Sequence, residues 1–308
     1  MKKGFFKDAI VQDQFDRDGF VVIDFISPAD AGYIAEKFYE LHPDLPKGFY
    51  AAAFSSDDKL KQEIFDRTQA VFEKVVDETF VDYKILGSTF LCKAPGEEGK
   101  VGVHQDWLVV DESVYSTATI WVPTADTTAK NGTLMVLPGS HLFMKTFRSP
   151  NIPFFYKGNE ELIWDNMITV PLKAGQAFVL NHAVIHASAA NTSTKERLVI
   201  AYALTHKDAD LMFYHKELSE TTNTIEKYKM PDDFFQRYYN IGQRPEFGSV
   251  AEKFDSLPNI ASKAELVKLI NRERVNSNLP EIALAEEKVL KQKERDLTLF
   301  EKLKNLFS

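Results

Sequence analysis

The sequence predicts a mainly β protein with flanking helices. Between residues 83 and 205 it contains many short stretches of β-branched, aromatic and other apolar residues, separated by turn-forming segments such as APGEEGK and AKNG. Helix-forming segments lie before and after this region, and none is predicted inside it. So many short strands without intervening helices favour a sandwich, a jelly roll or a barrel.

The first 80 residues are predicted to be mainly helical, with one short strand, GFVVIDFI, at residues 19–26. Ser27 is a suitable N-cap for a helix over PADAGYIAEKFYELH. Residues 55–80 carry capping and acidic residues first, and then apolar residues at helical spacing. Two helices, with the short strand before the first of them, are therefore expected ahead of the β region.

From about residue 207 onward the pattern indicates helix again, ending in a charged amphipathic segment at residues 281–308. We therefore expect residues 1–250 to form one domain and residues 251–308 a C-terminal helical extension. Packing of the terminal helix on the protein's own core is the expected use, with a homodimer contact or docking of a partner protein as alternatives. Its apolar face would carry Ile282, Val289, Leu297, Phe300, Leu303 and Phe307.

Composition and charge exclude several classes of protein. A hydrophobic share of 44% is ordinary for a folded globular chain. A formal net charge of −8, without any dense cluster of Lys and Arg, argues against nucleic acid as the main partner. The longest apolar runs are too short to span a membrane, and the first residues, MKKGFFKDAIVQDQF, lack the apolar core of a signal peptide. With the single cysteine, Cys92, these features lead us to expect a cytoplasmic location.

The segment GVHQDW, residues 102–107, places two polar residues in an apolar stretch that reads as a strand. Side chains alternate between the faces of a strand, so His104 and Asp106 are expected to point the same way. An imidazole and a carboxylate, completed by a second histidine, form the facial triad that holds Fe(II) and leaves coordination positions open. His186, in the predicted strand AVIHAS, is the best candidate for the third ligand, and His182 is its rival.

Two other histidines fit structural roles. His141 lies in PGSH and is expected to brace a turn. His42 ends a predicted helix, where a partial positive charge suits the helix dipole. Neither is therefore a candidate ligand.

Several ordered blocks resemble one known family. They are FDRDGFVVIDFISPADA, the HQD of residues 104–106, NGTLMVLPGSH at 131–141 and AGQAFVLNHAVIHASAANTSTKERL at 174–198. Together they resemble the phytanoyl-CoA dioxygenase family of Fe(II)- and 2-oxoglutarate-dependent oxygenases over roughly residues 10–205. The resemblance implies a double-stranded β-helix core, related to the jelly roll and the cupin fold.

The resemblance also implies site residues. The metal ligands would be His104, Asp106 and His186, and Arg197 would bind the far carboxylate of 2-oxoglutarate through two parallel charge-assisted hydrogen bonds, which lysine cannot reproduce. Other residues expected to line the cosubstrate pocket are Ser188, Gln105, Trp121 and Thr89. Each of these also has an ordinary interpretation as a strand, core or surface residue.

The implied reaction consumes O2 and 2-oxoglutarate, releases succinate and CO2, and hydroxylates an unactivated C–H bond of a small-molecule or acyl-type substrate. Asp106 favours this outcome, because halogenating relatives carry a small residue in its place. Two alternatives remain: a cupin-like metalloenzyme that does not use 2-oxoglutarate, and a non-catalytic jelly-roll binding module. The first gives no reason for Arg197 at its spacing and does not explain the NGTLMVLPGSH block. The second would tolerate the loss of a ligand residue, and none is lost.

The segment after PGSH, residues 142–166, is longer than the usual connection between strands, and such segments are often functional. We expect it to cover the mouth of the site and to bind an apolar or ring-bearing substrate whose anionic group meets Lys145, Arg148 and Lys157. The alternative is that its aromatic residues anchor it to the core. These aromatic residues are Phe143, Phe147, Phe154, Phe155, Tyr156 and Trp164.

Overall fold

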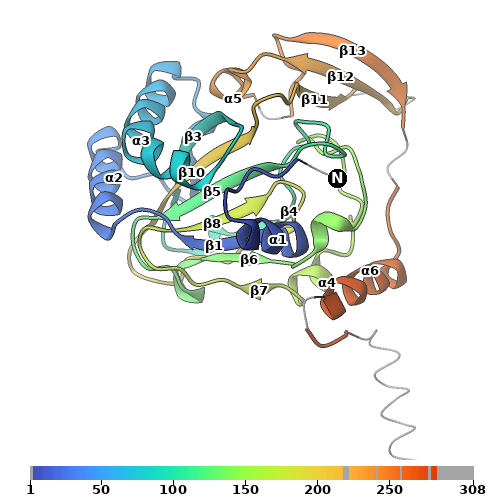
Figure 1. The fold of residues 1–308 in the computed structure, drawn as a ribbon, viewed down its shortest axis with the longest axis horizontal. Helices are drawn as coiled ribbons and strands as arrows, with labels where there is room; N and C mark the ends of the chain where they lie inside the picture. Colours follow the sequence, from blue (N-terminus) through green and yellow to red (C-terminus); the bar gives the residue numbers. More distant parts are fainter. Residues whose placement is uncertain (1–2, 218–221, 241, 257–258, 277–278, 283–308) are drawn as a thin grey trace, which may run out of the picture.

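The structure is a computed structural model that describes residues 3–217, 222–240, 242–256, 259–276 and 279–282. Its centre consists of two antiparallel sheets, with helices on the outside (Figure 1). The larger sheet has the strand order β1-β8-β5-β10-β3-β2. Its strands are β1 (Phe20–Asp24), β2 (Phe49–Ala51), β3 (Tyr83–Lys93), β5 (Thr117–Pro123), β8 (Gln176–Asn181) and β10 (Arg197–His206).

The smaller sheet has the order β4-β9-β6-β7. Apolar residues from both sheets, including Trp121, Val136 and Phe178, pack in one buried cluster between them. The paired antiparallel sheets form a double-stranded β-helix core, which confirms the predicted fold class. The strands of the smaller sheet are β4 (Val101–His104), β6 (Leu134–Val136), β7 (Ile168–Thr169) and β9 (His186–Ser188).

Three N-terminal helices lie beside the larger sheet: α1 (Ala9–Asp18), α2 (Pro28–Leu41) and α3 (Asp58–Thr79) (Figure 1). Phe38 and Phe72 of these helices pack against Ile200 and Tyr202 of β10 in the largest core cluster. Ser27 is the N-cap of α2 and its side chain accepts a hydrogen bond from a backbone N–H, as the sequence predicts. These helices cover one face of the larger sheet, and the site described below lies on the opposite face.

The prediction of helix from residue 207 onward is wrong for much of that region. Residues 211–255 contain a third sheet, in which β12 (Thr224–Met230) pairs antiparallel with β11 (Leu211–Lys216) and β13 (Ser249–Asp255). Ile225, Tyr228 and Met230 are buried and mostly alternate with less buried residues, which is the period of a half-buried strand. The short helix α5 (Phe234–Arg237) follows β12 and packs against β3.

Towards the C-terminus, α6 (Lys263–Asn276) buries Leu266, Val267 and Ile270. It packs with residues of the long 142–166 segment, which contains α4 (Glu160–Trp164). Because β13 runs across the predicted boundary at residue 250, the extension does not begin as a helix; the division into two units stays a prediction. Ile282 is partly buried beside α6, and the other predicted residues of the terminal helix lie outside the described residues.

Four short 3₁₀ helices complete the described elements: η1 (Ala52–Phe54), η2 (Glu97–Gly99), η3 (Ala129–Asn131) and η4 (Ser140–Leu142). His141 lies in η4, where its Nε2 hydrogen-bonds the Asp16 carbonyl at 3.0 Å, in keeping with a bracing role. His42 follows the end of α2 and contacts Phe38 and Tyr50. Among the described residues, no helix has the length and hydropathy that crossing a membrane requires.

Candidate metal and cosubstrate site

The smaller sheet brings His104 and His186 directly opposite each other. β4 and β9 are antiparallel, and these two residues are register partners whose ring centroids lie 4.1 Å apart. Asp106 follows the end of β4, and its Oδ1 lies 4.0 Å from His104 Nε2 and 3.9 Å from His186 Nε2. One ligand atom from each residue lies within 4.8 Å of the other two, so the three form a group that could hold a metal ion.

Hydrogen bonds to the backbone orient both imidazole rings. His104 Nδ1 lies 2.9 Å from the Gly102 carbonyl oxygen, and His186 Nδ1 lies 3.1 Å from that of Val184. If each Nδ1 carries the proton and donates to its carbonyl, each Nε2 lone pair faces Asp106, as metal ligation requires. Burial, together with the neighbouring His186, lowers the pKa of His104 to about 4, so this ring is neutral near pH 7.

Asp106 completes the group as the anionic member. Burial acts to raise the pKa of its carboxyl group, but the surrounding histidines and Arg148 outweigh burial and keep the pKa below its ordinary value. Two imidazoles and one carboxylate are the ligand set that suits Fe(II) with open coordination positions. The residues present therefore fit the metal that the sequence implies.

His182 lies close to this group but faces another partner. Its Nε2 is 3.0 Å from Thr119 Oγ1 and 3.9 Å from Asp106 Oδ2. The ring is buried, and burial lowers its pKa. The geometry therefore favours His186 over His182 as the third ligand, an assignment that stays a prediction.

Arg197 begins β10 and is 4% exposed. One of its Nη atoms donates to the Gly132 carbonyl at 3.0 Å, its guanidinium carbon lies 5.0 Å from the centre of the Trp121 ring, and its buried Nε has no hydrogen-bond partner. Among the described residues no carboxylate forms an ion pair with it, and burial lowers its pKa to about 10. A buried cation without an anionic partner is costly, so this position is suited to an anionic ligand.

Lys93, which the sequence analysis missed, is a second buried cation at this end of the site. It is the register partner of Arg197, and its Nζ donates to Ser188 Oγ at 2.5 Å and to the carbonyls of Ser188 and Ala189. Burial, with the nearby charge of Arg197, lowers its pKa to about 7. A lysine at the end of a strand carries no distinctive signal, and only the pairing of β3 with β10 reveals its position.

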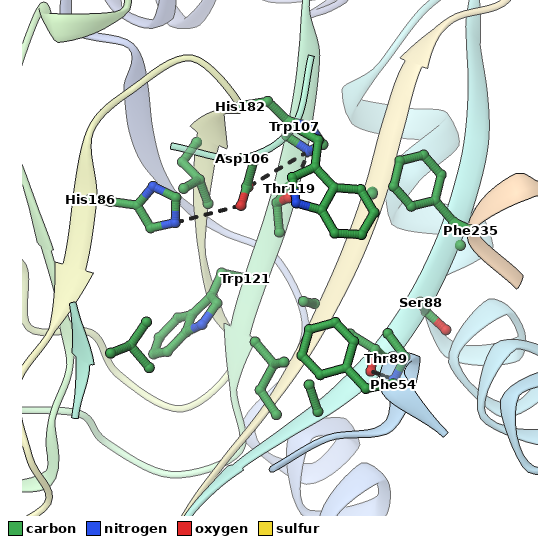
Figure 2. A pocket seen from close by; sticks show the side chains of 18 of the residues that line it. Phe54, Ser88, Thr89, Asp106, Trp107, Thr119, Trp121, His182, His186 and Phe235 are labelled. Atoms are coloured by element: carbon green, nitrogen blue, oxygen red, sulfur yellow. Dashed lines mark hydrogen bonds and ion pairs between the residues drawn. The ribbon is translucent and has the colours of Figure 1, made fainter. Parts of the chain in front are cut away.

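All eight residues predicted to bind the metal or the cosubstrate line one cavity of about 340 Å³. Gln105 is buried and donates to the Ala183 carbonyl at 2.5 Å, whereas its Oε1 has no partner. Thr89 accepts a hydrogen bond from the Ala53 N–H at 2.8 Å. Figure 2 shows His186, Asp106 and Trp121 on one side of this cavity and Phe54, Ser88 and Phe235 on the other. The second group was not anticipated from the sequence.

The expected role of the 142–166 segment is wrong. None of its described residues lines the cavity, and Phe143, Phe155 and Tyr156 are buried against α6. Arg148 is 1% exposed, donates to both carboxylate oxygens of Glu112, and donates through Nε to the Asp106 carbonyl at 2.9 Å. Arg148 therefore positions the chain around Asp106 and is not free to bind a substrate anion. The aromatic residues anchor the segment to the core.

Comparison with known proteins agrees with this geometry. The family model of phytanoyl-CoA dioxygenase (PhyH) matches residues 15–199. The chain belongs to this family. The match includes the segments that carry His104, Asp106, His186 and Arg197.

Two curated relatives share part of the chain. Phytanoyl-CoA dioxygenase of Arabidopsis thaliana is 27% identical over 64% of this chain and 76% of its own length. Phytanoyl-CoA dioxygenase domain-containing protein 1 of Danio rerio is 32% identical over 38% of this chain and 43% of its own length. Among solved structures, EvdO2 of Micromonospora carbonacea var. aurantiaca in complex with 2-oxoglutarate covers 67% of this chain and 94% of its own, at 16% identity and a TM-score of 0.45.

Proposed function

We propose that the protein is an Fe(II)- and 2-oxoglutarate-dependent dioxygenase that hydroxylates an unactivated C–H bond of a small organic substrate, with release of succinate and CO2. The observation that carries this proposal is the shared cavity. A group of two histidines and one aspartate suited to Fe(II) opens onto the same cavity as a buried arginine without an anionic partner. A keto acid with a second carboxylate would satisfy both at once.

Each residue would have a separate task. His104, Asp106 and His186 would hold Fe(II), which would supply the oxygen activation and redox chemistry that no side chain provides. Arg197 would bind the far carboxylate of 2-oxoglutarate, with Trp121 beneath the guanidinium and Ser188 beside it. Gln105 and Thr89 would shape the pocket, and the apolar residues of the cavity would limit the access of water.

Two observations favour this function over its alternatives. A cupin-like metalloenzyme without 2-oxoglutarate would have no use for the buried pair Arg197 and Lys93, which is costly to maintain without an anion. A non-catalytic module would not need the complete ligand group. The carboxylate of Asp106 supports hydroxylation, because it would occupy a position that halogenating members of the family leave free for chloride.

The test is oxygen consumption by the purified protein with Fe(II) and 2-oxoglutarate, without added substrate, followed by quantification of succinate. We expect slow oxygen uptake with one succinate per O2, and none when either Fe(II) or 2-oxoglutarate is omitted. Uptake that does not depend on 2-oxoglutarate would support the cupin-like alternative. No uptake at all, with Fe(II) and 2-oxoglutarate both bound, would require a substrate screen before hydroxylation could be maintained.

A further inference from the structure

The cavity continues beyond the positions assigned to metal and cosubstrate. Arg197, Ala201 and Ala203 of β10 all line it, and six residues of strand at ~3.3 Å each span about 20 Å. Arg197 and Trp121 occupy one end of this line. At the other end, Ala203 is the register partner of Gly87 on β3, and both lack a bulky side chain. This small-residue floor leaves room that 2-oxoglutarate bound at Arg197 would not fill.

Aromatic side chains enclose this outer part of the cavity. Phe54 of η1, Phe65 of α3, Phe235 of α5 and Trp107 line it. The Trp107 and Phe235 rings are nearly parallel, with centroids 6.2 Å apart, and Figure 2 shows them on the same side of the cavity. Phe54 is 48% exposed, which places it at the mouth. Such walls suit a ligand with an apolar or aromatic body.

One cation lines this outer part among the described residues. The side chain of Lys61, in the first turns of α3, is only 4% exposed, and its Nζ makes no hydrogen bond. Its nearest charged partner is Asp58, with Oδ1 at 3.0 Å, but the Asp58 side chain is 72% exposed and belongs to the solvent side. The Tyr239 ring centre lies 5.6 Å away. Lysine is seldom buried so completely, its only ion-pair partner among the described residues is this exposed carboxylate, and Lys61 is one of the residues that line the cavity.

We propose that the outer part of the cavity binds the primary substrate as an organic anion with an apolar, ring-bearing body, whose carboxylate reaches Lys61. The inference rests on the proposed function and deepens it by naming the substrate class. Lys61 takes the role that the sequence analysis assigned to Arg148, whose guanidinium is committed to Glu112. With the carboxylate held at Lys61, the body of the substrate would lie over Ala203 and Gly87, towards Asp106.

The test compares two probes of the same shape, 4-phenylbutanoate and 4-phenylbutan-1-ol. Each is titrated calorimetrically, without oxygen, into the protein loaded with Fe(II) and 2-oxoglutarate. We expect the acid to bind the parent protein about tenfold more tightly than the alcohol, in line with a charge-assisted hydrogen bond. Lys61→Met should abolish this preference by weakening the acid alone, whereas Lys61→Arg should keep it. Lys74→Met, at an exposed position on the same helix, should match the parent.

A second variant changes the small-residue floor at Ala203 and leaves the charge of Lys61 in place. Ala203→Leu should weaken both probes by about tenfold, because the added side chain fills the space, and should leave the Kd of 2-oxoglutarate unchanged. An acid preference that survives Lys61→Met would overturn the proposal, since the carboxylate would then bind elsewhere, for example at Arg197. Equal binding of both probes to the parent, or no binding of either, would overturn it too.

Failure of this inference can be separated from failure of the proposed function. The same titrations give the Kd of 2-oxoglutarate for the parent and for Lys61→Met. Undetectable binding of 2-oxoglutarate would refute the proposed function. The acid preference would still test the role of Lys61, because it is judged only by the difference between the parent and Lys61→Met. Normal binding of 2-oxoglutarate without an acid preference would refute the substrate class alone.

Discussion

Asp106 is the residue on which the candidate metal group depends most, because one of its oxygens lies nearly equidistant from the Nε2 atoms of His104 and His186. The alternation argument predicted that His104 and Asp106 face the same way, and they do, although β4 ends at His104. The carbonyl of Asp106 is held by Arg148 from a distant segment. The sequence pattern could identify the ligand pair but not the arginine that positions it.

We predict that alanine at His104, Asp106 or His186 lowers the affinity for Fe(II) by more than about 100-fold, because each change removes a direct ligand. His182→Ala should lower it by about tenfold or less, since His182 bonds Thr119. Anaerobic equilibrium dialysis against Fe(II) measures this. The assignment of the third ligand is wrong if His186→Ala retains iron and His182→Ala loses it.

Arg197→Lys should raise the Kd of 2-oxoglutarate by about tenfold or more, because a planar donor pair is replaced by a point charge and a hydrogen bond to a charged group contributes roughly 1.5–3 kcal/mol. The affinity for Fe(II) should stay within about twofold of the parent value. Calorimetric titration with 2-oxoglutarate is the measurement. Identical titration curves for parent and variant would remove Arg197 from the cosubstrate pocket.

Lys93 makes the stability of the ligand-free protein depend on pH. Burial lowers its pKa to about 7, so below pH 7 the folded protein carries the full free-energy cost of the buried charge. As the pH rises above 7, the buried lysine loses its proton and this cost decreases. The free energy of unfolding should therefore rise between about pH 7 and 9, by at most about 1.4 kcal/mol per pH unit. Lys93→Met should remove this rise. Urea denaturation at three pH values tests it, and parallel pH profiles for parent and variant would contradict it.

At the scale of elements, the segments with strict alternation or clear capping residues were predictable. Ser27 caps α2, β1 lies within the predicted 19–26 strand, and the strands that carry His186 and Arg197 form as expected. Residues 211–255 were not predictable in the same way, because their polar residues gave no clear period. Glu226, for example, is buried in a strand and paired with Arg244 and Lys253, which only the folded sheet brings together.

At the scale of elements, we predict that the packing of α6 stabilises the fold. Ile270 is fully buried against the 142–166 segment, so Ile270→Ala should lower the free energy of unfolding by about 2–4 kcal/mol. The Kd of 2-oxoglutarate should not change, because this cluster does not line the cavity. Val275→Ala, at a position 56% exposed on the same helix, is the control and should change stability by less than about 0.5 kcal/mol. A similar small loss for Ile270→Ala would show that α6 does not stabilise the core.

At the scale of the whole molecule, the fold places residues from distant parts of the chain around one cavity. His104, His186 and Arg197 could be named from the sequence because their blocks resemble a family. Lys61 and Lys93 could not be named, because a lysine acquires its special environment only when strands and helices pack around it. The role of Arg148 was misjudged for the same reason, since its partner Glu112 lies in another segment.

The central claim is that Fe(II) and 2-oxoglutarate bind side by side in this cavity. An anaerobic crystal structure of the protein with both, with anomalous diffraction recorded at the iron absorption edge, tests it most directly. We predict a single strong anomalous peak bonded to His104, Asp106 and His186, with the far carboxylate of 2-oxoglutarate in two hydrogen bonds to Arg197. Iron bonded to His182 in place of His186, or 2-oxoglutarate bound away from Arg197, would contradict the claim.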